Sequence, residues 1–565
     1  MYEQAKAWLA RDIDDVSQAE LSELIDRKAT DELILRFSSR LAFGTAGLRG
    51  VVGAGPNRMN RLVIIETATG LGHYLQQHVP DAKQRGVIIG YDGRVDSKQF
   101  ARDAAEALMA QGFNVYLTEQ VAATPIVAFG ITRRNAAAGI VVTASHNPPQ
   151  YNGFKVYWHN GAQIIPPHDA GIAAKIEEAA QQPVRQMPLP EGEKQGLLHW
   201  VGDVYYQQYK AAILCHPYSA SITPSHLTIA YTAMHGVGAE MAESLLKEAG
   251  FHSVYSVASQ REPDGTFPTV NFPNPEEPGA MDLVEEEAEC CGADLAFAND
   301  PDADRIAVSV KTPQGNYQRL SGDQFGCLLA DYLLSQYPNG MVGNTIVSSK
   351  LLQQIATQHG GVYFQTLTGF KWLSNVAIDK QSANHPFLMA YEEAIGYCVG
   401  STVWDKDGLS ALLIFAQMTE ILAQQGITVW DKLAEIYRQH GFYCNAQHSI
   451  ATQAGQPLIG DKLRAQPPTD IAGIPIRCCH DFATGLSTHT DGTQNPVEYP
   501  LSDILIYDLD DGSRVIVRPS GTEPKVKCYY EVVIEMNEGE DFFAAQRRAN
   551  AKMTRMVEAH QRTLR

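Results

Sequence analysis

Short apolar runs rich in β-branched residues alternate along this chain with longer amphipathic segments. Residues 87–90 and 114–117 have the composition of buried strands. Between them, residues 97–111 place apolar side chains at the spacing of one helix face. Strands separated by a helix can pair in parallel, because the helix carries the chain back across the sheet. This stretch therefore predicts an α/β fold with mostly parallel sheets.

The same order of elements recurs further along the chain. A strand predicted at 227–233 precedes a helix predicted at 239–249, and two more strands are expected at 295–298 and 306–310. The first forty residues differ, because their apolar positions follow helical spacing. We therefore expect a helical N-terminus followed by repeated α/β units.

Breaks in this alternation indicate where domains begin and end. Residues 181–196 are rich in Pro, Gln and Glu, and loop-like segments at 465–475 and 484–500 precede a last strand-rich module. A chain of 565 residues fits about four domains at roughly 150 residues each. We predict domains at 1–200, 201–325, 326–455 and 456–565.

Charge and composition exclude several classes of partner. The formal net charge is −19 and Lys and Arg do not gather into a run, so we expect no nucleic acid partner. A small anionic substrate stays possible, because a local cationic pocket can override the global charge. No apolar run approaches the ~18 residues of a membrane span, and the acidic N-terminus does not have a signal-peptide pattern. With nine cysteines and no CxxC spacing, we expect reduced, buried thiols in a cytoplasmic protein.

A serine follows one predicted strand in a loop that contains two prolines. Ser145 lies in the segment TASHNPP, after an apolar strand at 139–142. Parallel sheets place reactive groups at the carboxyl ends of their strands. Taken alone, the segment also suits a turn or capping serine, since Ser and Asn favour turns. A hydrolase nucleophile is disfavoured, because no GxSxG surrounds Ser145 and the adjacent His146 is no evidence for a triad base.

Three aspartates alternate in a short loop between two predicted strands. Asp300, Asp302 and Asp304 lie in NDPDADR, and their like charges repel one another unless a cation neutralises them. Carboxylate oxygens suit Mg²⁺ far better than zinc. A calcium EF-hand is excluded, because Arg305 and Lys311 stand where its loop requires Gly and Glu. The loop predicts a magnesium site, with a solvated acidic turn as the alternative.

A third segment combines cations, hydroxyls and a glycine turn. The segment RPSGTEPKVK at 518–527 follows a predicted strand, and its amides, hydroxyls and cations could cradle a phosphate dianion. It is equally consistent with a polar hairpin turn, and no Walker sequence is present. Two further loops carry weaker signals. Residues 368–372 offer an aromatic wall with a cation, and Glu392 offers a carboxylate for sugar hydroxyls, although taken alone Glu392 is better explained by an exposed acidic turn.

Together these motifs resemble the α-D-phosphohexomutase superfamily, specifically its phosphoglucomutase/phosphopentomutase branch. They occur in the family's order, span most of the chain and are highly specific as a set. The matching pieces are FGTAGLRG at 43–50, TASHNPPQYNGFKVYW at 143–158, PDGTFPTVNFPNPEE at 263–277, NDPDADRIAV at 299–308, GFKW at 369–372, EEAIGY at 392–397 and RPSGTEPKVK at 518–527.

The resemblance implies a fold of four domains around a central cleft, namely three related α/β domains and a smaller α+β C-terminal domain. In that arrangement the four domains contribute, in order, a phosphoserine loop, a metal loop, a sugar loop and a phosphate loop. The catalytic residues that it implies are Ser145, His146, Lys155 and Arg49, and one Mg²⁺ per chain is held by phosphorylated Ser145 with Asp300, Asp302 and Asp304. The implied substrate-binding residues are Arg305, Gly369, Phe370, Lys371, Glu392, Arg518, Ser520, Gly521, Thr522 and Lys527.

The resemblance also implies an activity. It is that of an intramolecular phosphotransferase that interconverts glucose 1-phosphate and glucose 6-phosphate through a phosphoserine, with a sugar bisphosphate as intermediate and activator. The implied partner is a small phosphosugar, bound by a monomer or weak homodimer. We expect Lys155 to carry the proton, which would require burial beside cations to depress its pKa.

One departure from the family leaves the sugar open. Several hexomutase branches carry a serine and a histidine in the sugar loop, where this chain has Ala394 and Gly396. A phosphopentomutase acting on ribose or deoxyribose 1- and 5-phosphates, or a glucose 1,6-bisphosphate synthase, is therefore an alternative at the same site. A remote alternative is a non-catalytic phosphosugar sensor, against which the intact Ser145 and three aspartates argue.

Overall fold

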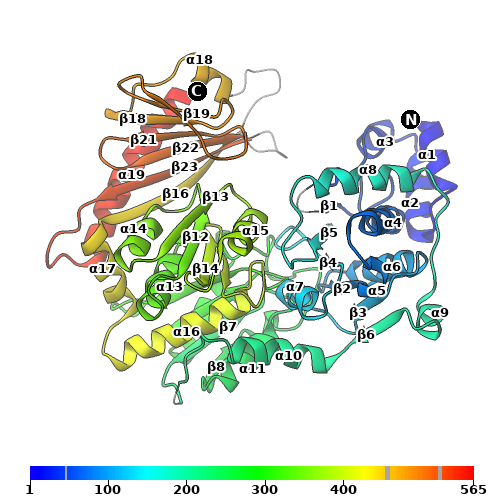
Figure 1. Ribbon diagram of the computed structural model, residues 1–565, viewed down its shortest axis with the longest axis horizontal. Helices are drawn as coiled ribbons and strands as arrows, with labels where there is room; N and C mark the ends of the chain where they lie inside the picture. Colours follow the sequence, from blue (N-terminus) through cyan, green and yellow to red (C-terminus); the bar gives the residue numbers. More distant parts are fainter. Residues whose placement is uncertain (45–46, 223, 452–458, 520–524, 565) are drawn as a thin grey trace. The chain divides into compact units, whose positions relative to one another are not determined.

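The structure is a computed structural model that describes residues 1–44, 47–222, 224–451, 459–519 and 525–564 (Figure 1). The chain divides into two units. One contains Met1–Gly322 with Gly369–Glu420, and the other contains Asp323–Thr368 with Ile421–Arg565.

A six-stranded sheet organises the N-terminal part of the first unit. Its strands are β1 (Leu48–Val51), β2 (Val87–Tyr91), β3 (Val115–Thr118), β4 (Ala138–Val142), β5 (Tyr151–Trp158) and β6 (Leu198–Val201), in the order β1-β5-β4-β2-β3-β6. The pairs β4–β2, β2–β3 and β3–β6 are parallel, as predicted. By contrast, β5 runs antiparallel to β4, because the link between them is too short for a crossover helix.

Helices precede and cover this sheet. They are α1 (Tyr2–Leu9), α2 (Asp15–Asp26), α3 (Thr30–Phe37), α4 (Arg61–His78), α5 (Ala82–Arg85), α6 (Ser97–Met109), α7 (Thr124–Arg133), α8 (His168–Ala180), α9 (Leu189–Lys194) and α10 (Asp203–Leu214). The helical N-terminus is therefore confirmed. The start of α4 is capped by Asn60, whose side-chain oxygen accepts a hydrogen bond from the Val63 amide at 3.0 Å. Helix α4 packs against both α6 and α8 (Figure 1).

A five-stranded sheet follows in the same unit. It consists of β7 (Thr228–Thr232), β8 (Ser253–Ser256), β9 (Leu295–Asn299), β10 (Ile306–Lys311) and β11 (Tyr317–Arg319), with helices α11 (Ala239–Glu248) and α12 (Asp282–Cys291) and the 3₁₀ turn η1 (Ala258–Gln260). The order is β11-β10-β9-β7-β8, and β7 is parallel to both of its neighbours. Strands β9 and β10 pair antiparallel, so the link between them is a tight loop at the carboxyl end of β9.

The first unit ends with an antiparallel strand pair and two helices. They are α15 (Phe370–Lys380), β14 (Phe387–Glu392), β15 (Gly396–Val399) and α16 (Gly408–Gln424). Residues 408–420 of α16 are all buried, which explains their apolar composition. Within the described part of the chain no single helix has the length and apolar composition to span a membrane, and α16 meets that criterion only as a bent pair with α17 (Val429–His440).

The second unit combines a helical part with an antiparallel sheet. Its other elements are α13 (Gly322–Gln336), β12 (Met341–Thr345), α14 (Leu351–Gln358), β13 (Val362–Thr366), β16 (Phe442–Ala451), α18 (Ile459–Ala465), β17 (Asp470–Ile471), β18 (Ile474–Asp481), β19 (Leu486–His489), β20 (Gln494–Pro496), β21 (Leu505–Leu509), β22 (Arg514–Pro519), β23 (Lys525–Ile534) and α19 (Phe542–Leu564). The sheet order is β16-β23-β22-β21-β18-β19-β20, with β17 paired to β18. Helix α19 lies along β16 and β23 (Figure 1).

The predicted strands and helices of the α/β repeats are confirmed. The observed ends of these elements lie within two residues of the predicted ends. The domain boundaries at residues 200, 325 and 455 stay predictions. All nine cysteines are free, as expected, but the prediction that they are buried is wrong for Cys215 and Cys290, which are exposed.

Candidate active site

Ser145 stands in a strained loop three residues after β4. Its φ is +51°, in the left-handed region that a residue with a side chain seldom adopts. The Ser145 amide donates to the Thr143 hydroxyl at 2.8 Å, which helps to hold that conformation. Backbone strain of this kind costs on the order of 1 kcal/mol or more and persists where the surroundings impose it, commonly at functional sites.

The buried Arg94 imposes the shape of this loop. Its Nη2 donates to the carbonyls of Ser145 and Asn147, both at 2.6 Å. Its Nη1 donates to the carbonyls of Pro148 and Tyr151 at 2.9 and 3.0 Å. One guanidinium therefore binds four carbonyls of this irregular stretch of backbone at once. Sequence reasoning missed Arg94, whose only signal was an arginine soon after a buried strand.

We expect Arg94→Lys to lower kcat/KM by about 100-fold at 25 °C, because a lysine keeps the charge but cannot bind four carbonyls in a fixed fork. Steady-state kinetics and a thermal melt measure the effect. The matched control is Arg61→Lys, since Arg61 binds Asp103 through two nitrogens at 2.8 and 2.9 Å away from the serine loop. Equal losses of activity in the two variants would show that Arg94 has no special part in placing Ser145.

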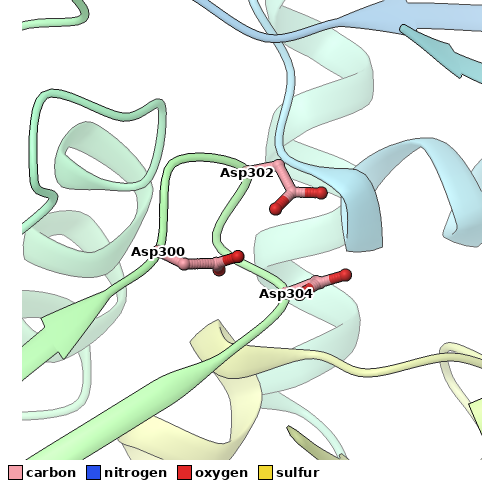
Figure 2. Close-up of side chains that lie close together, drawn as sticks. All are labelled: Asp300, Asp302 and Asp304. Atoms are coloured by element: carbon pink, nitrogen blue, oxygen red, sulfur yellow. The ribbon is translucent and has the colours of Figure 1, made fainter. Parts of the chain in front are cut away.

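The three aspartates converge beside Ser145. Asp300, Asp302 and Asp304 are buried in the loop between β9 and β10, and one oxygen of each lies within 4.8 Å of the other two. Figure 2 shows their carboxylates turned toward one shared region. The Ser145 hydroxyl donates to Asp300 Oδ2 at 2.7 Å. The two motifs, far apart in the sequence, thus meet within one unit of the structure.

The donor set fits a hard cation. Asp302 Oδ1 and Asp304 Oδ1 are buried and make no hydrogen bond within the described part of the chain. Burial raises the pKa of Asp300 well above its ordinary value, and repulsion by Asp302 and Asp304 raises it further. A bound cation would remove both penalties, and oxygen ligands of this kind suit Mg²⁺.

Two buried lysines also face the acidic loop. Lys155 Nζ donates to Asp302 Oδ2 at 2.6 Å and to Asp304 Oδ2 at 2.8 Å, and Lys406 Nζ lies 3.1 Å from Asp304 Oδ2. Burial disfavours the charged form of Lys155, but Asp302 and Asp304 outweigh burial and raise its pKa. The expectation of a depressed pKa for Lys155 is therefore wrong in this structure, because its nearest neighbours are carboxylates rather than cations.

His146 and two arginines surround the serine on another side. His146 Nδ1 lies 3.2 Å from Ser145 Oγ, and burial followed by repulsion from Arg305 and Arg49 lowers the pKa of His146 well below its ordinary value. Arg49 donates to the Asn147 side-chain oxygen at 3.0 Å. The Arg305 amide donates to an Asp300 oxygen at 3.0 Å. Burial and the neighbouring arginines thus favour the neutral form of the imidazole beside Ser145.

The predicted sugar loops lie next to the acidic loop. The Gly369 amide, which precedes α15, donates to Glu392 Oε1 at 2.7 Å. Arg305 forms an antiparallel bridge with Gly396, and the amide following Arg305 donates to the Ile395 carbonyl at 3.1 Å. Phe370 and Lys371 form the first turn of α15, where Lys371 Nζ lies 5.3 Å from the centre of the Trp372 ring.

The predicted phosphate loop belongs to the second unit. Arg518 on β22 pairs with Lys527 on β23. Ser520, Gly521 and Thr522 lie outside the described residues.

Comparison with known proteins matches most of the chain. Residues 40–183, 203–315 and 321–440 match the α/β/α domains I, II and III of the phosphoglucomutase/phosphomannomutase family, and residues 490–548 match its C-terminal domain. The chain belongs to this family, within the α-D-phosphohexomutase superfamily. It therefore has the four-domain α/β fold that the motifs implied, and it is an enzyme of the phosphomutase class.

Individual relatives are similar over nearly their full length. The chain is 37% identical to a "Probable phosphoribomutase" of Schizosaccharomyces pombe, over 92% of each chain. It is 40% identical to a "Probable phosphomannomutase" of Haemophilus influenzae over 84% of this chain and 93% of the relative. It is 36% identical to the phosphopentomutase of Mus musculus over 93% and 89%. All three names are those of phosphosugar mutases, two for a pentose and one for mannose.

A solved structure shows the same fold. The phosphoglucomutase parafusin of Paramecium, in its open form, aligns with a TM-score of 0.67 over 92% of this chain and 95% of that chain. At 17% identity the alignment shows the fold alone.

Two further residues beside the aspartates of this mutase were not predicted from the sequence. The Thr124 hydroxyl donates to Asp302 Oδ2 at 2.6 Å, and Lys406 lies beside Asp304. Thr124 begins helix α7, and a threonine followed by a proline is an ordinary sequence for the start of a helix, so it gave no sign of a functional role. Lys406 lies in the segment DKDG, which has no spacing typical of a site.

Proposed function

We propose that this mutase moves a phosphoryl group between two positions of one sugar through phosphorylated Ser145, interconverting glucose 1-phosphate and glucose 6-phosphate. The observation that carries the proposal is the 2.7 Å contact of Ser145 Oγ with Asp300, beside two buried carboxylate oxygens that accept no hydrogen bond from any described residue. A hydroxyl held there can carry a phosphate whose charge a shared cation balances. Ser145, Asp300, Asp302 and Asp304 are the proposed Mg²⁺ ligands.

The proposed reaction has two transfers. Phosphorylated Ser145 passes its phosphoryl group to a free hydroxyl of the sugar monophosphate, so that the Ser145 P–O bond breaks and a new P–O bond forms to the sugar oxygen. The departing Ser145 oxygen takes a proton from Lys155, and Lys155 regains one from the sugar hydroxyl, so that Ser145 ends as a free hydroxyl. The bound sugar bisphosphate then turns over, and its other phosphate returns to Ser145. Free sugar bisphosphate would act as activator by phosphorylating Ser145 directly. Mg²⁺, when bound, offsets the charge of the transferring phosphoryl group.

The residues around Ser145 have proposed roles that follow from their charge. Lys155 is held as an ammonium by Asp302 and Asp304, so it can give a proton to an oxygen that leaves phosphorus. His146 is neutral and within reach of Ser145 Oγ, so it can accept a proton there. Arg49 adds positive charge at the same loop.

The proposed substrate contacts come from four segments. Arg305 of the acidic loop forms a bridge with Gly396, and Glu392 at the end of β14 is paired with the same Gly396. Gly369, Phe370 and Lys371 begin α15 next to Glu392, which suits hydroxyl recognition. The phosphate that does not react is proposed to bind at Arg518, Ser520, Gly521, Thr522 and Lys527.

A pentose phosphate is the second candidate substrate. Ala394 and Gly396 lack the side chains that read hexose hydroxyls in several hexomutase branches, and two relatives are named phosphoribomutase and phosphopentomutase. Glucose 1,6-bisphosphate synthesis would use the same Ser145. Rates on glucose 1-phosphate, ribose 1-phosphate and deoxyribose 1-phosphate, measured on one preparation, separate these candidates; no turnover of any of them would contradict the proposed function. A monomer or weak homodimer stays our proposal for the assembly.

We expect Arg518→Gln to raise KM by about 10-fold or more and to change kcat less, because a charge-assisted bond to phosphate contributes about 1.5–3 kcal/mol. Steady-state kinetics with the sugar monophosphate measure both constants. The control is Arg477→Gln, an exposed arginine on β18. A KM of Arg518→Gln equal to that of the control would remove the 518–527 segment from the site.

A further inference from the structure

A second cavity, of about 290 Å³, opens at the carboxyl ends of three parallel strands of the first sheet, β2, β3 and β6. Ligands of α/β proteins bind outside the carboxyl ends of such strands, and ligand pockets begin at about 300 Å³. The cavity is lined by Tyr91, Lys98, Arg102, Leu117, Thr118, Glu119 and Trp200. None of these residues belongs to the proposed mutase site, so the cavity has no role in the function described so far.

Trp200 of the edge strand β6 forms an aromatic wall of this cavity. In the parallel register Trp200 is the partner of Leu117 on β3, so both side chains lie on the same face of the sheet. Leu117 is buried, whereas 40% of Trp200 is exposed. Tryptophan is highly buried on average, and an indole at the mouth of a cavity offers a flat face on which a planar ring can stack. This wall therefore fits an aromatic group.

Two cations from α6 face the same cavity. Lys98 and Arg102 are four residues apart on the helix, so their side chains lie on one face of it. Both are exposed, and neither forms an ion pair with a residue that the structure describes. In a chain with a formal net charge of −19, two unpaired cations at a cavity are a local reversal of charge. They can bind a phosphate through charge-assisted hydrogen bonds.

Glu119 adds one carboxylate to the lining. Its backbone is held in place, because its amide donates to the Val201 carbonyl at 3.1 Å and its carbonyl accepts from the Tyr91 hydroxyl at 3.2 Å. Acidic residues beside nucleotide sites accept hydrogen bonds from ribose hydroxyls. The carboxylate also repels a ligand that is anionic along its whole length. The ligand that fits therefore has one anionic end and a neutral hydroxyl-bearing part.

We propose that this cavity binds a nucleoside monophosphate. Its base stacks on Trp200, its ribose hydroxyls donate to Glu119, and its phosphate binds Lys98 and Arg102. A nucleoside monophosphate combines the three groups that the lining complements, namely a planar ring, vicinal hydroxyls and a single phosphate. The inference goes beyond the proposed mutase function and does not depend on it.

Calorimetric titration of the full chain tests this site with three probes: adenosine 5′-monophosphate, adenosine and inorganic phosphate. The monophosphate is expected to bind at least about 10-fold more tightly than either fragment, because only it uses both the aromatic wall and the cations. Trp200→Ala is expected to weaken its binding by at least about 5-fold, since stacking of a base on an aromatic side chain contributes that much. The double variant Lys98→Gln with Arg102→Gln is expected to weaken it by at least about 10-fold.

Matched controls remove similar side chains elsewhere in the same unit. Tyr255→Ala removes an aromatic ring on β8 that is 46% exposed, and Arg133→Gln removes an exposed cation at the end of α7. Both are expected to bind the monophosphate as wild type does, and a thermal melt checks that each variant is folded. The double variant changes only exposed side chains, so it tests the site even if Trp200→Ala does not fold.

Three results would overturn the proposal. In the first, wild-type protein binds the monophosphate no more tightly than inorganic phosphate. In the second, the double variant binds it as tightly as wild type does, which would place the nucleotide elsewhere, for example at the mutase site. In the third, the double variant loses binding but folded Trp200→Ala does not, which would show an anion site that does not recognise the base.

Discussion

Ser145→Ala is expected to lower kcat/KM by at least about 10⁴-fold, because removal of an enzyme's nucleophile costs a loss of that order. The hydroxyl oxygen is the atom proposed to bond phosphorus, and the alanine variant removes it while keeping the neighbouring His146, whose Nδ1 lies 3.2 Å from that oxygen in the wild type. Steady-state kinetics with a sugar 1-phosphate and catalytic sugar bisphosphate measure the loss.

The control for this change is Ser17→Ala. Ser17 is also buried, and its hydroxyl donates to Asp12 at 2.6 Å, but it lies in α2. It is expected to lose some stability and to keep its kcat/KM within a few-fold. A Ser145→Ala enzyme that works within about 10-fold of wild type would place the phosphate carrier elsewhere.

Asp302→Asn is expected to lower kcat by about 100-fold or more and to weaken the dependence of activity on Mg²⁺. The amide is nearly the same size as the carboxylate, so the change removes a charge from the cluster without opening a cavity. It also removes the strongest partner of Lys155, which donates to Asp302 at 2.6 Å. A magnesium titration by calorimetry, run beside the kinetics, reports binding independently of turnover.

The matched control is Asp491→Asn, which changes an exposed aspartate in the second unit. Its activity and its Mg²⁺ affinity are expected to equal those of wild type. Wild-type enzyme that keeps full activity in excess chelator would contradict the metal site, whatever the variant does.

Local sequence pattern was enough to predict the elements that carry the site. Short apolar runs predicted the strand before Ser145 and the two strands on either side of the aspartates. In the structure these strands are β4, β9 and β10. The antiparallel pairing of β5 with β4 and of β10 with β9 was less predictable, because the relative direction of two strands depends on the length of the link between them. The type of each motif residue followed from chemistry, since alternating carboxylates in a tight loop need a cation.

The supporting residues could not be predicted from local pattern, because their partners are distant in the chain. Arg94 binds carbonyls more than fifty residues away, and those carbonyls need it only after the loop has folded. Lys155 shows the same limit: its pKa depends on Asp302 and Asp304, which a reading of its own segment leaves out. Lys406 is likewise brought to Asp304 by the fold, since about a hundred residues separate the two in the sequence.

The central claim is that Ser145 carries the phosphate. Intact-protein mass spectrometry after incubation with glucose 1,6-bisphosphate and Mg²⁺ tests it most directly, followed by peptide mapping. The proposed function predicts one added phosphate on wild-type protein, located on Ser145, and none on Ser145→Ala. Phosphate on the alanine variant, or none on the wild type, would contradict it.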